Sequence, residues 1–247
     1  MTEELVAPAK LTLSLRVTGV RDDGYHLIDA VMVTLDLHDS VVVEPRTADR
    51  DPEPLMIDGP FAAGVPVDGT NLVSRALALT GRPARVRITK RIPNGGGLGG
   101  GSADAAAVLR WAGWSDLGAA SRLGADIPFC LSGHRRARVT GIGEIVEPLR
   151  SVPGVVTLVI PPLSSSTPEV YRAWDRLGGP RSESGNDLEP AAIAVQPELA
   201  RWRDRIREAA GLSPTLAGSG ATWFLEGDHG HVGPALDGAR VIVTGRG

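Results

Sequence analysis

The stretch from Pro93 to Ala106 reads Pro-Asn-Gly-Gly-Gly-Leu-Gly-Gly-Gly-Ser-Ala-Asp-Ala-Ala, and six of the seven residues 95–101 are glycine. A structural turn needs only about one or two glycines. A longer run leaves backbone amides uncovered and lets the chain approach a bound group closely. Because an alanine-rich helix is expected over residues 103–112, stopped by Gly113, these amides would lie at a helix N-terminus, where anions bind. The stretch predicts a phosphate-binding loop.

Three readings of this loop compete. A Walker A loop requires Gly-Lys-Ser/Thr, and no lysine follows the glycines. The dinucleotide pattern G-x-G-x-x-G is met by Gly95, Gly97 and Gly100, but the match is nearly automatic in such a glycine-rich run and no clear βαβ unit surrounds it. A flexible linker is disfavoured by the ordered elements expected on both sides. A nucleotide triphosphate suits the loop, with Ser102 as helix N-cap or as a ligand to phosphate or Mg²⁺.

Hydrophobic periodicity predicts a mixture of strands and helices around the loop. Strict alternation marks a strand at residues 10–15, and Asp-Gly turn chemistry at 21–24 leads to a second strand that continues through Leu37. Further strands are expected at 41–43, 86–90, 137–139, 155–160, 215–216, 221–225 and 241–243, and further helices at 71–81, 117–123, 169–177 and 199–210. Residues 46–69 are expected to be irregular, with one short strand at 55–57. Since no regular βαβ alternation is present, the pattern favours an α+β fold.

Composition narrows the class of protein. The chain has 247 residues, of which 42% are hydrophobic and 22% charged, as in ordinary globular proteins of one two-lobed unit or two packed domains. A net charge of −3 without a basic block makes nucleic acid an unfavoured partner. No stretch approaches the roughly 18 apolar residues of a membrane span, and the acidic N-terminus is unlike a signal peptide. With the lone Cys130, these features predict a cytoplasmic protein without a membrane partner.

The run from Pro93 to Ala106 resembles the phosphate-binding motif of the GHMP kinases. Other segments narrow the resemblance to one family within them, the 4-diphosphocytidyl-2-C-methyl-D-erythritol kinases. These segments are Pro8-Ala9-Lys10-Leu11-Thr12-Leu13, Asp23-Gly24-Tyr25-His26, Gly124–Phe129, Gly141–Glu144, Asn186–Glu189 and Ala217–Thr222. They follow the family's order over residues 6–225, and Asp-Gly-Tyr-His is the most specific because general GHMP kinases lack it.

The resemblance implies a two-lobed α+β GHMP kinase fold with the active site between the lobes. We assign residues 1–148 to an ATP-binding N-terminal domain and residues 149–247 to a C-terminal domain. The implied reaction is transfer of the ATP γ-phosphate, with Mg²⁺, to the 2-hydroxyl of 4-diphosphocytidyl-2-C-methyl-D-erythritol, in non-mevalonate isoprenoid precursor biosynthesis. The expected partner is thus a small molecule carrying cytidine diphosphate, and the protein would be a monomer or homodimer. No residue could be assigned as a metal ligand.

The resemblance also implies roles at the reacting centre. Asp126 would be the catalytic carboxylate, which orients the substrate hydroxyl and accepts its proton. Lys10, on the polar face of the first strand, would hold Asp126 ionised and neutralise charge on the moving phosphoryl group. Thr12 would contact the substrate, although the family most often has Asn there. Ala103 stands where a second Ser is frequent, and the segments 103–123 and 175–185 are shorter than in the family.

Binding roles follow in the same way. Tyr25 and His26 would recognise cytosine by stacking and hydrogen bonding, and Tyr171 would cover the other face of the base. The residues expected around ATP are Asn71, Leu72, Lys90, Pro93, Asn94, Gly95, Gly96, Gly97, Leu98, Gly99, Gly100, Gly101, Ser102, Ala103 and Asp104. The segment Gly218-Ser219-Gly220 would bring a second backbone loop to the phosphate site, with a tight structural turn as an equal alternative.

Competing interpretations stay open for the individual residues and for the function. Asp126 could cap a helix, Lys10 could face solvent and Tyr171 could be a core residue. A GHMP kinase acting on a sugar, mevalonate or homoserine is the first functional alternative, and the segment 23–26 argues against it. A non-catalytic nucleotide- or sugar-binding sensor is the second, and the presence of both Lys10 and Asp126 argues against that. A dinucleotide-dependent oxidoreductase ranks lower still.

Overall fold

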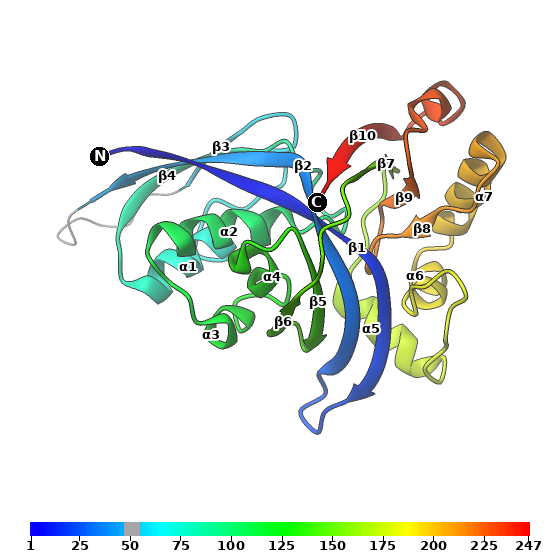
Figure 1. The fold of residues 1–247 in the computed structure, drawn as a ribbon, viewed down its shortest axis with the longest axis horizontal. Coiled ribbons are helices and arrows are strands. Elements are labelled where there is room, and N and C mark those ends of the chain that lie inside the picture. Colours follow the sequence, from blue (N-terminus) through cyan, green and yellow to red (C-terminus); the bar gives the residue numbers. More distant parts are fainter. Residues whose placement is uncertain (47–54) are drawn as a thin grey trace.

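The computed structural model describes residues 1–46 and 55–247 and shows the expected α+β architecture (Figure 1). The strands are β1 (Glu3–Val20), β2 (His26–Pro45), β3 (Met56–Asp58), β4 (Ala84–Thr89), β5 (Arg136–Gly141), β6 (Ile145–Pro148), β7 (Gly154–Ile160), β8 (Thr215–Leu216), β9 (Trp223–Glu226) and β10 (Arg240–Arg246). The helices are α1 (Leu72–Thr80), α2 (Gly100–Trp111), α3 (Leu117–Ser121), α4 (Ile127–Ser132), α5 (Thr167–Arg176), α6 (Glu189–Val195), α7 (Glu198–Ala210) and the 3₁₀ helix η1 (Gly230–Ala235). Within the described ranges, no helix is long and apolar enough to cross a membrane.

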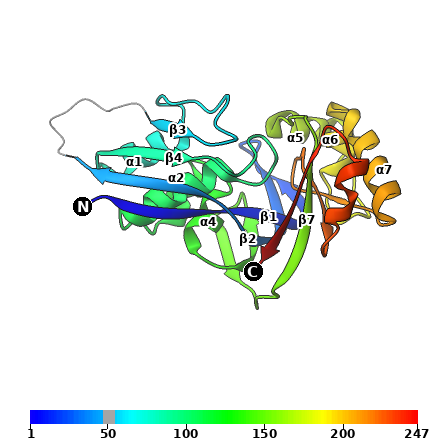
Figure 2. The same cartoon turned by 90° about the horizontal axis from the view of Figure 1, so that it is seen from above.

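One hydrogen-bonded sheet connects the whole chain. Its strands follow the order β3-β4-β2-β10-β7-β9-β8, while β1 and β5 also pair with β2 and β6 pairs with β5. Helices α1–α4 gather around the N-terminal strands (Figure 1), and Figure 2 shows α5, α6 and α7 together at the opposite end of the molecule. Helix α2 packs directly on β1 and β2. The glycine-rich loop therefore enters a helix that rests on the centre of the sheet.

The β1–β2 hairpin runs along the entire molecule. Its antiparallel register extends from Glu3 opposite Val43 to Val20 opposite His26, with three register shifts on the way. The separate strand that the sequence predicts at residues 41–43 is wrong, since these residues continue β2 without a break. The polar residues before them look like a turn, but Asp39 among them is fully buried and finds its partners inside the fold.

The helices that flank the loop begin and end for identifiable reasons. Asn71 caps α1 through its side-chain oxygen, which accepts from the amide of Val73 at 2.8 Å, and Gly81 ends the helix with φ 62°, as predicted. Helix α2 begins at Gly100, three residues earlier than predicted. The reason is Gly99, which takes a left-handed conformation with φ 68° and starts the helix inside the glycine run. Ser102 therefore lies in the first turn and is not the N-cap.

Several short elements are missing from the sequence prediction, namely β6, α4, α6 and η1. Each has seven residues or fewer, too few for a helical or strand period to be recognised. The predicted strand at 55–57 is found as β3, shifted by one residue, whereas residues 47–54 of the predicted irregular segment lie outside the described residues.

The apolar core has two clusters, and each one draws on both halves of the chain. The cluster around α2 contains Leu158 and Phe224 from the C-terminal half. The cluster beside α5 and α7 contains Leu15 and Met32 from the N-terminal half. Strand β10 returns to pair with β2 near the middle of the sheet. The cavity walls described below are therefore held in place by packing between residues from the two halves of the chain.

A buried charge cluster supports the entry to the glycine-rich loop. Lys90, Asp39 and Asp104 are each at most 4% exposed in their side chains. The Lys90 ammonium donates to both carboxylates, with a distance of 2.6 Å to Oδ2 of Asp104. Asp39 also accepts from the backbone amides of Arg91 and Ile92, the latter at 2.8 Å. The cluster thereby ties β2, the chain leading into the loop, and helix α2 together.

This cluster holds one more negative than positive charge. Burial raises the pKa of Asp104 to about 7, because the carboxylate of Asp39 reinforces the cost of burial and Lys90 offsets it only in part. For Lys90, burial lowers the pKa, but the two carboxylates together outweigh this and leave the pKa raised. Lys90 therefore keeps its positive charge. The ionised form of Asp104 is disfavoured by its burial and by the nearby carboxylate of Asp39.

We predict that Lys90→Met and Asp104→Asn differ sharply in stability. Lys90→Met leaves two buried carboxylates without their shared cation and should lower the free energy of unfolding by about 3–5 kcal/mol. Asp104→Asn keeps the balanced Lys90–Asp39 pair and should cost less than about 2 kcal/mol at pH 8. Urea unfolding followed by circular dichroism measures both values.

The pH dependence supplies the internal control. A carboxylate whose folded pKa is raised stabilises the fold at low pH and loses this contribution as the pH rises through about 7. The cost of Asp104→Asn relative to wild type should therefore shrink between pH 5 and pH 8. A cost that grows with pH, or a Lys90→Met variant as stable as Asp104→Asn, would contradict this description of the cluster.

Candidate active site

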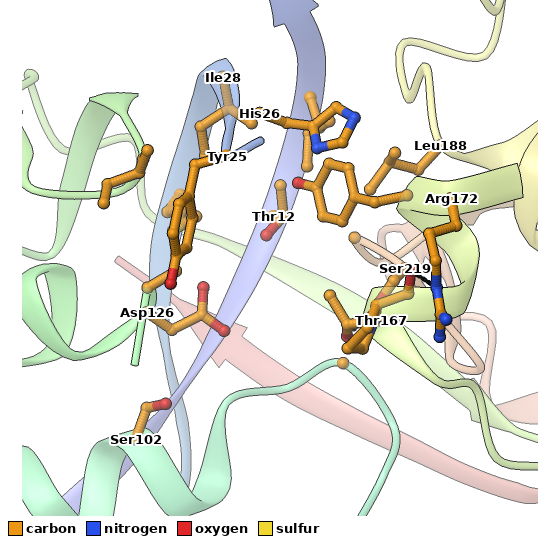
Figure 3. A pocket seen from close by; sticks show the side chains of 18 of the residues that line it. Thr12, Tyr25, His26, Ile28, Ser102, Asp126, Thr167, Arg172, Leu188 and Ser219 are labelled. Atoms are coloured by element: carbon orange, nitrogen blue, oxygen red, sulfur yellow. Dashed lines mark hydrogen bonds between the residues drawn. The ribbon is translucent and has the colours of Figure 1, made fainter. Parts of the chain in front are cut away.

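A cavity of about 660 Å³ opens between the β1–β2 hairpin, the N-terminus of α2 and helix α5 (Figure 3). Its walls include predicted catalytic and substrate-binding residues together with others that the sequence did not single out. The lining residues that matter below are Lys10, Thr12, Tyr25, His26, Gly97, Ser102, Asp126, Thr167, Tyr171, Arg172, Asp175, Gly218 and Ser219. Figure 3 shows Tyr25, Asp126 and Ser102 along one side, with Thr167, Arg172 and Ser219 along the other. All six predicted catalytic and substrate-binding residues line this one cavity.

Lys10 and Asp126 form an ion pair at the floor of the cavity. The Lys10 ammonium lies 3.2 Å from Oδ2 of Asp126 and donates to Oγ1 of Thr12 at 3.3 Å. Lys10 comes from β1 and is buried, so it is not a solvent-facing strand lysine. Asp126 occupies the N-cap position of α4, yet its side chain makes no capping hydrogen bond. Its carboxylate is 32% exposed and is thus accessible to a hydroxyl group in the cavity.

The glycine-rich loop packs against the second glycine segment. The carbonyl oxygen of Gly96 accepts from the amide of Thr222 at 3.3 Å. A Cβ atom at Gly97 would lie 2.5 Å from the carbonyl oxygen of Ala217, and Gly97 has a φ of +76°. Only glycine fits at such a contact. Residues 217–222 are therefore more than a turn between strands, since they form the surface on which the glycine-rich loop rests.

Asn186 fixes this second segment, a role that sequence reasoning did not assign. Its buried side-chain amide donates to the carbonyl oxygens of Leu216 at 2.8 Å and Gly218 at 2.7 Å. The hydroxyls of Thr167 and Ser219 meet at 2.7 Å, which joins the segment to the start of α5. The Asn-Asp-Leu-Glu motif was the one signal in the sequence. The contact itself could not be predicted, because Asn186 lies 30 residues before Leu216.

A smaller cavity of about 200 Å³ lies on the other side of the glycine-rich loop. It is lined by Leu72, Lys90, Ile92 and residues 93–102. Gly97 and Ser102 line both cavities, so the two cavities adjoin the same loop. Most of the predicted ATP contacts therefore line one hollow beside the cavity that holds the Lys10–Asp126 pair.

Three of the residues predicted to contact ATP lie outside both cavities. Of the described residues, Asn71, Ala103 and Asp104 are not among those that line either cavity. Asn71 caps α1 and donates to the carbonyl oxygen of Pro66 at 2.8 Å. Ala103 is fully buried, and Asp104 is paired with Lys90. These residues support the elements around the hollow.

An aromatic group forms the far end of the larger cavity. The His26 ring lies 4.6 Å from the Tyr171 ring and meets the edge of Trp174 at 5.6 Å, measured between centroids. Its Nε2 atom lies 2.8 Å from Oδ1 of Asp175. Tyr25 at the hairpin tip is 60% exposed. Burial raises the pKa of Tyr171 well above its usual range, so its hydroxyl stays neutral.

Comparisons with known proteins agree with this arrangement. The family model described as GHMP kinases N terminal domain matches residues 71–134. A 4-diphosphocytidyl-2-C-methyl-D-erythritol kinase of Paracoccus denitrificans is 43% identical over 88% of this chain and 84% of its own length. A kinase of the same name from Cereibacter sphaeroides is 41% identical over 90% of this chain and 88% of its own length.

Solved structures extend the comparison to the fold. A crystal structure of 4-(cytidine 5'-diphospho)-2C-methyl-D-erythritol kinase has 33% identity and a TM-score of 0.76, and covers 99% of this chain and 100% of that one. A mevalonate kinase with 12% identity and a TM-score of 0.54 shares the fold alone, over 99% of this chain and 98% of its own. These likenesses confirm the predicted GHMP kinase fold, and the chain belongs to the 4-diphosphocytidyl-2-C-methyl-D-erythritol kinase family.

Proposed function

We propose that this kinase transfers the γ-phosphate of ATP to the 2-hydroxyl of 4-diphosphocytidyl-2-C-methyl-D-erythritol, a step of non-mevalonate isoprenoid precursor biosynthesis. The observation that carries the proposal is the Lys10–Asp126 pair, held at 3.2 Å in the larger cavity beside the loop that also lines the smaller one. A donor on one side of the glycine-rich loop and an acceptor on the other would meet at this pair. The names of the relatives supply the identity of the acceptor.

The glycine-rich loop and α2 would hold the ATP phosphates. Backbone amides of residues 95–101 and the N-terminus of α2 favour negative charge at this place. Leu72, Lys90, Pro93 and Asn94 line the adjoining hollow and would contact the adenosine. Asn71, Ala103 and Asp104 would act one step away, by keeping α1, α2 and Lys90 in position.

Asp126 would act as the general base. Its exposed carboxylate would accept the proton of the 2-hydroxyl as that oxygen forms a bond to the γ-phosphorus. The bond from this phosphorus to the β-phosphate oxygen breaks, and ADP leaves with the electron pair. Lys10 would hold the Asp126 carboxylate in place through their ion pair and offset the negative charge of the transferring group. Thr12, hydrogen bonded to the Lys10 ammonium, would contact the acceptor beside this hydroxyl.

The aromatic end of the cavity would bind the cytosine. Tyr25 and Tyr171 offer ring faces for stacking, and His26 offers a ring nitrogen for the edge of the base. This places the base at one end of the acceptor and the reacting hydroxyl at the other. The length of the cavity then selects an acceptor with a linker between the two.

Mg²⁺ fits the donor set of the loop. Within the described residues, no cluster of three or more His, Cys, Asp or Glu side chains could hold a metal. Mg²⁺ in nucleotide sites commonly relies on phosphate oxygens, water and one or two protein oxygens instead. The hydroxyl of Ser102, which lines both cavities, would be such a ligand. Bound Mg²⁺ would neutralise charge on the β- and γ-phosphates.

An acceptor panel tests the proposed function. ADP release from MgATP is measured with 4-diphosphocytidyl-2-C-methyl-D-erythritol, mevalonate, homoserine and several sugars. We expect turnover with the cytidylyl acceptor at least about 100-fold above any other, because only that acceptor fills the aromatic end of the cavity. Comparable turnover with another alcohol would keep the kinase and refute this acceptor. ATP binding without turnover of any acceptor would favour a sensor.

Two glycine substitutions test the contact between the loops. Gly95 and Gly97 have similar φ values of +71° and +76°, but a Cβ at Gly95 meets nothing closer than 3.8 Å. We predict that Gly97→Ala weakens ATP binding more than about tenfold, whereas Gly95→Ala stays within about threefold of wild type. Titration calorimetry with ATP gives both dissociation constants, and thermal unfolding checks that both variants fold. Equal losses in the two variants would mean that backbone strain alone, rather than packing on Ala217, accounts for the effect.

A further inference from the structure

Helix α5 presents one continuous face to the larger cavity. The residues that line the cavity from this helix are Thr167, Pro168, Tyr171, Arg172 and Asp175. Their spacing of three to four residues is that of one helix face. The aromatic and acidic members lie at the end occupied by His26, and Thr167 touches the second glycine segment through Ser219. This face therefore extends from the base-binding end toward the phosphoryl-transfer end.

Among the described residues that line the cavity, Arg172 is the cationic side chain that contacts no carboxylate. Lys10 is paired with Asp126, and Asp175 is paired with His26. Asp175 would be the natural partner of Arg172 at i+3 on the helix, but its carboxylate receives Nε2 of His26 at 2.8 Å instead. In the part of the chain that the structure describes, Arg172 forms no ion pair. The guanidinium of Arg172 thus lines the cavity without a carboxylate in contact with it.

The guanidinium of Arg172 is also prepared for a ligand. Its Nε atom donates to the carbonyl oxygen of Pro168 at 3.2 Å, one turn back on the helix. This hydrogen bond restricts the side chain and leaves the two terminal nitrogens available as paired donors. Figure 3 shows the guanidinium beside Thr167 and Ser219, on the opposite side of the cavity from Asp126. Such a fork matches two oxygens of a phosphate group.

We propose that Arg172 binds the diphosphate bridge of the acceptor. This inference rests on the proposed function, because it takes the base at Tyr25, His26 and Tyr171 and the reacting hydroxyl at Asp126. The diphosphate joins those two parts of the substrate, and its negative charge would pair with the guanidinium of Arg172, which no described carboxylate contacts. Arg172 would hold it at the α5 wall, and the hydroxyls of Thr167 and Ser219 lie beside the same place.

Arg176 provides the matched control. It is exposed on the same helix, four residues further on, in the last turn, and it is not among the residues that line the cavity. A solvated helix arginine contributes little beyond its interaction with the helix dipole. Arg172→Gln and Arg176→Gln remove the same charge from the same element, so that only the place of the charge differs.

The test measures how much the diphosphate adds to binding. Cytidine and cytidine diphosphate are titrated calorimetrically into wild type, Arg172→Gln and Arg176→Gln, with a non-hydrolysable ATP analogue saturating the loop. In wild type we expect the diphosphate to tighten binding about tenfold to 100-fold over cytidine. Arg172→Gln should reduce this advantage to about twofold while cytidine binds as before, and Arg176→Gln should retain the wild-type ratio. In steady state, Arg172→Gln should raise the KM for the cytidylyl acceptor and leave the KM for ATP unchanged.

The outcomes separate this inference from the proposed function. If neither cytidine nor its diphosphate binds to the wild-type protein, the cytosine site itself is wrong. If both bind and Arg172→Gln keeps the full diphosphate advantage, the cytosine site stands and Arg172 is a surface arginine. If Arg176→Gln loses as much as Arg172→Gln, the effect is one of total charge, which also refutes a specific site at Arg172.

Discussion

Lys10 is the residue on which the arrangement of the active site depends. Its backbone amide donates to the carbonyl oxygen of Leu98 at 3.0 Å and so fixes the glycine-rich loop to β1. Its side chain lies over Gly99, where a Cβ would come within 2.8 Å of Cγ of Lys10. Its ammonium then reaches Asp126 at 3.2 Å. One strand residue thereby sets the distance between the glycine-rich loop and the carboxylate of Asp126.

Buried polar groups hold the two glycine segments that meet beside Lys10. Asp39 and Lys90 fix the chain where it enters the first segment, and the amide of Asn186 fixes the second. Burying such groups costs free energy unless each one finds partners. They specify backbone positions that apolar packing alone would leave variable. The loop amides are thus preorganised before any nucleotide binds.

Much of the fold could be predicted from local patterns. Alternation predicted residues 10–15, the middle of β1, but neither of its ends. Asn71 and Gly81 predicted both ends of α1, because a helix cap acts within a few residues. The polar run before residue 41 was misread as a break in β2, since nothing nearby in the sequence shows that Asp39 pairs with Lys90, 51 residues away. Short elements such as α4 depend on tertiary packing and gave no period of their own.

The active site also has a part that could be predicted from the sequence and a part that could not. The resemblance predicted that Lys10 and Asp126 lie together at the active site, and both line one cavity. It could not show that Asp104 serves Lys90 rather than lining the hollow, or that Asn186 supports Gly218. Those contacts join residues distant in sequence, and only the folded chain brings them together. The role of Arg172 could not be predicted for the same reason. Asp175 is spaced to pair with Arg172 on the helix but pairs with His26 instead, and only the fold shows this.

The central claim is that Asp126 accepts the proton of the acceptor hydroxyl. The most direct measurement compares single-turnover phosphoryl transfer and ATP affinity in Asp126→Ala, with Glu208→Ala, an exposed change on α7, as control. We expect the transfer rate of Asp126→Ala to fall by about 100-fold to 10,000-fold, with the ATP dissociation constant within about twofold of wild type and Glu208→Ala unaffected. Transfer by Asp126→Ala at a rate near that of wild type would contradict the account.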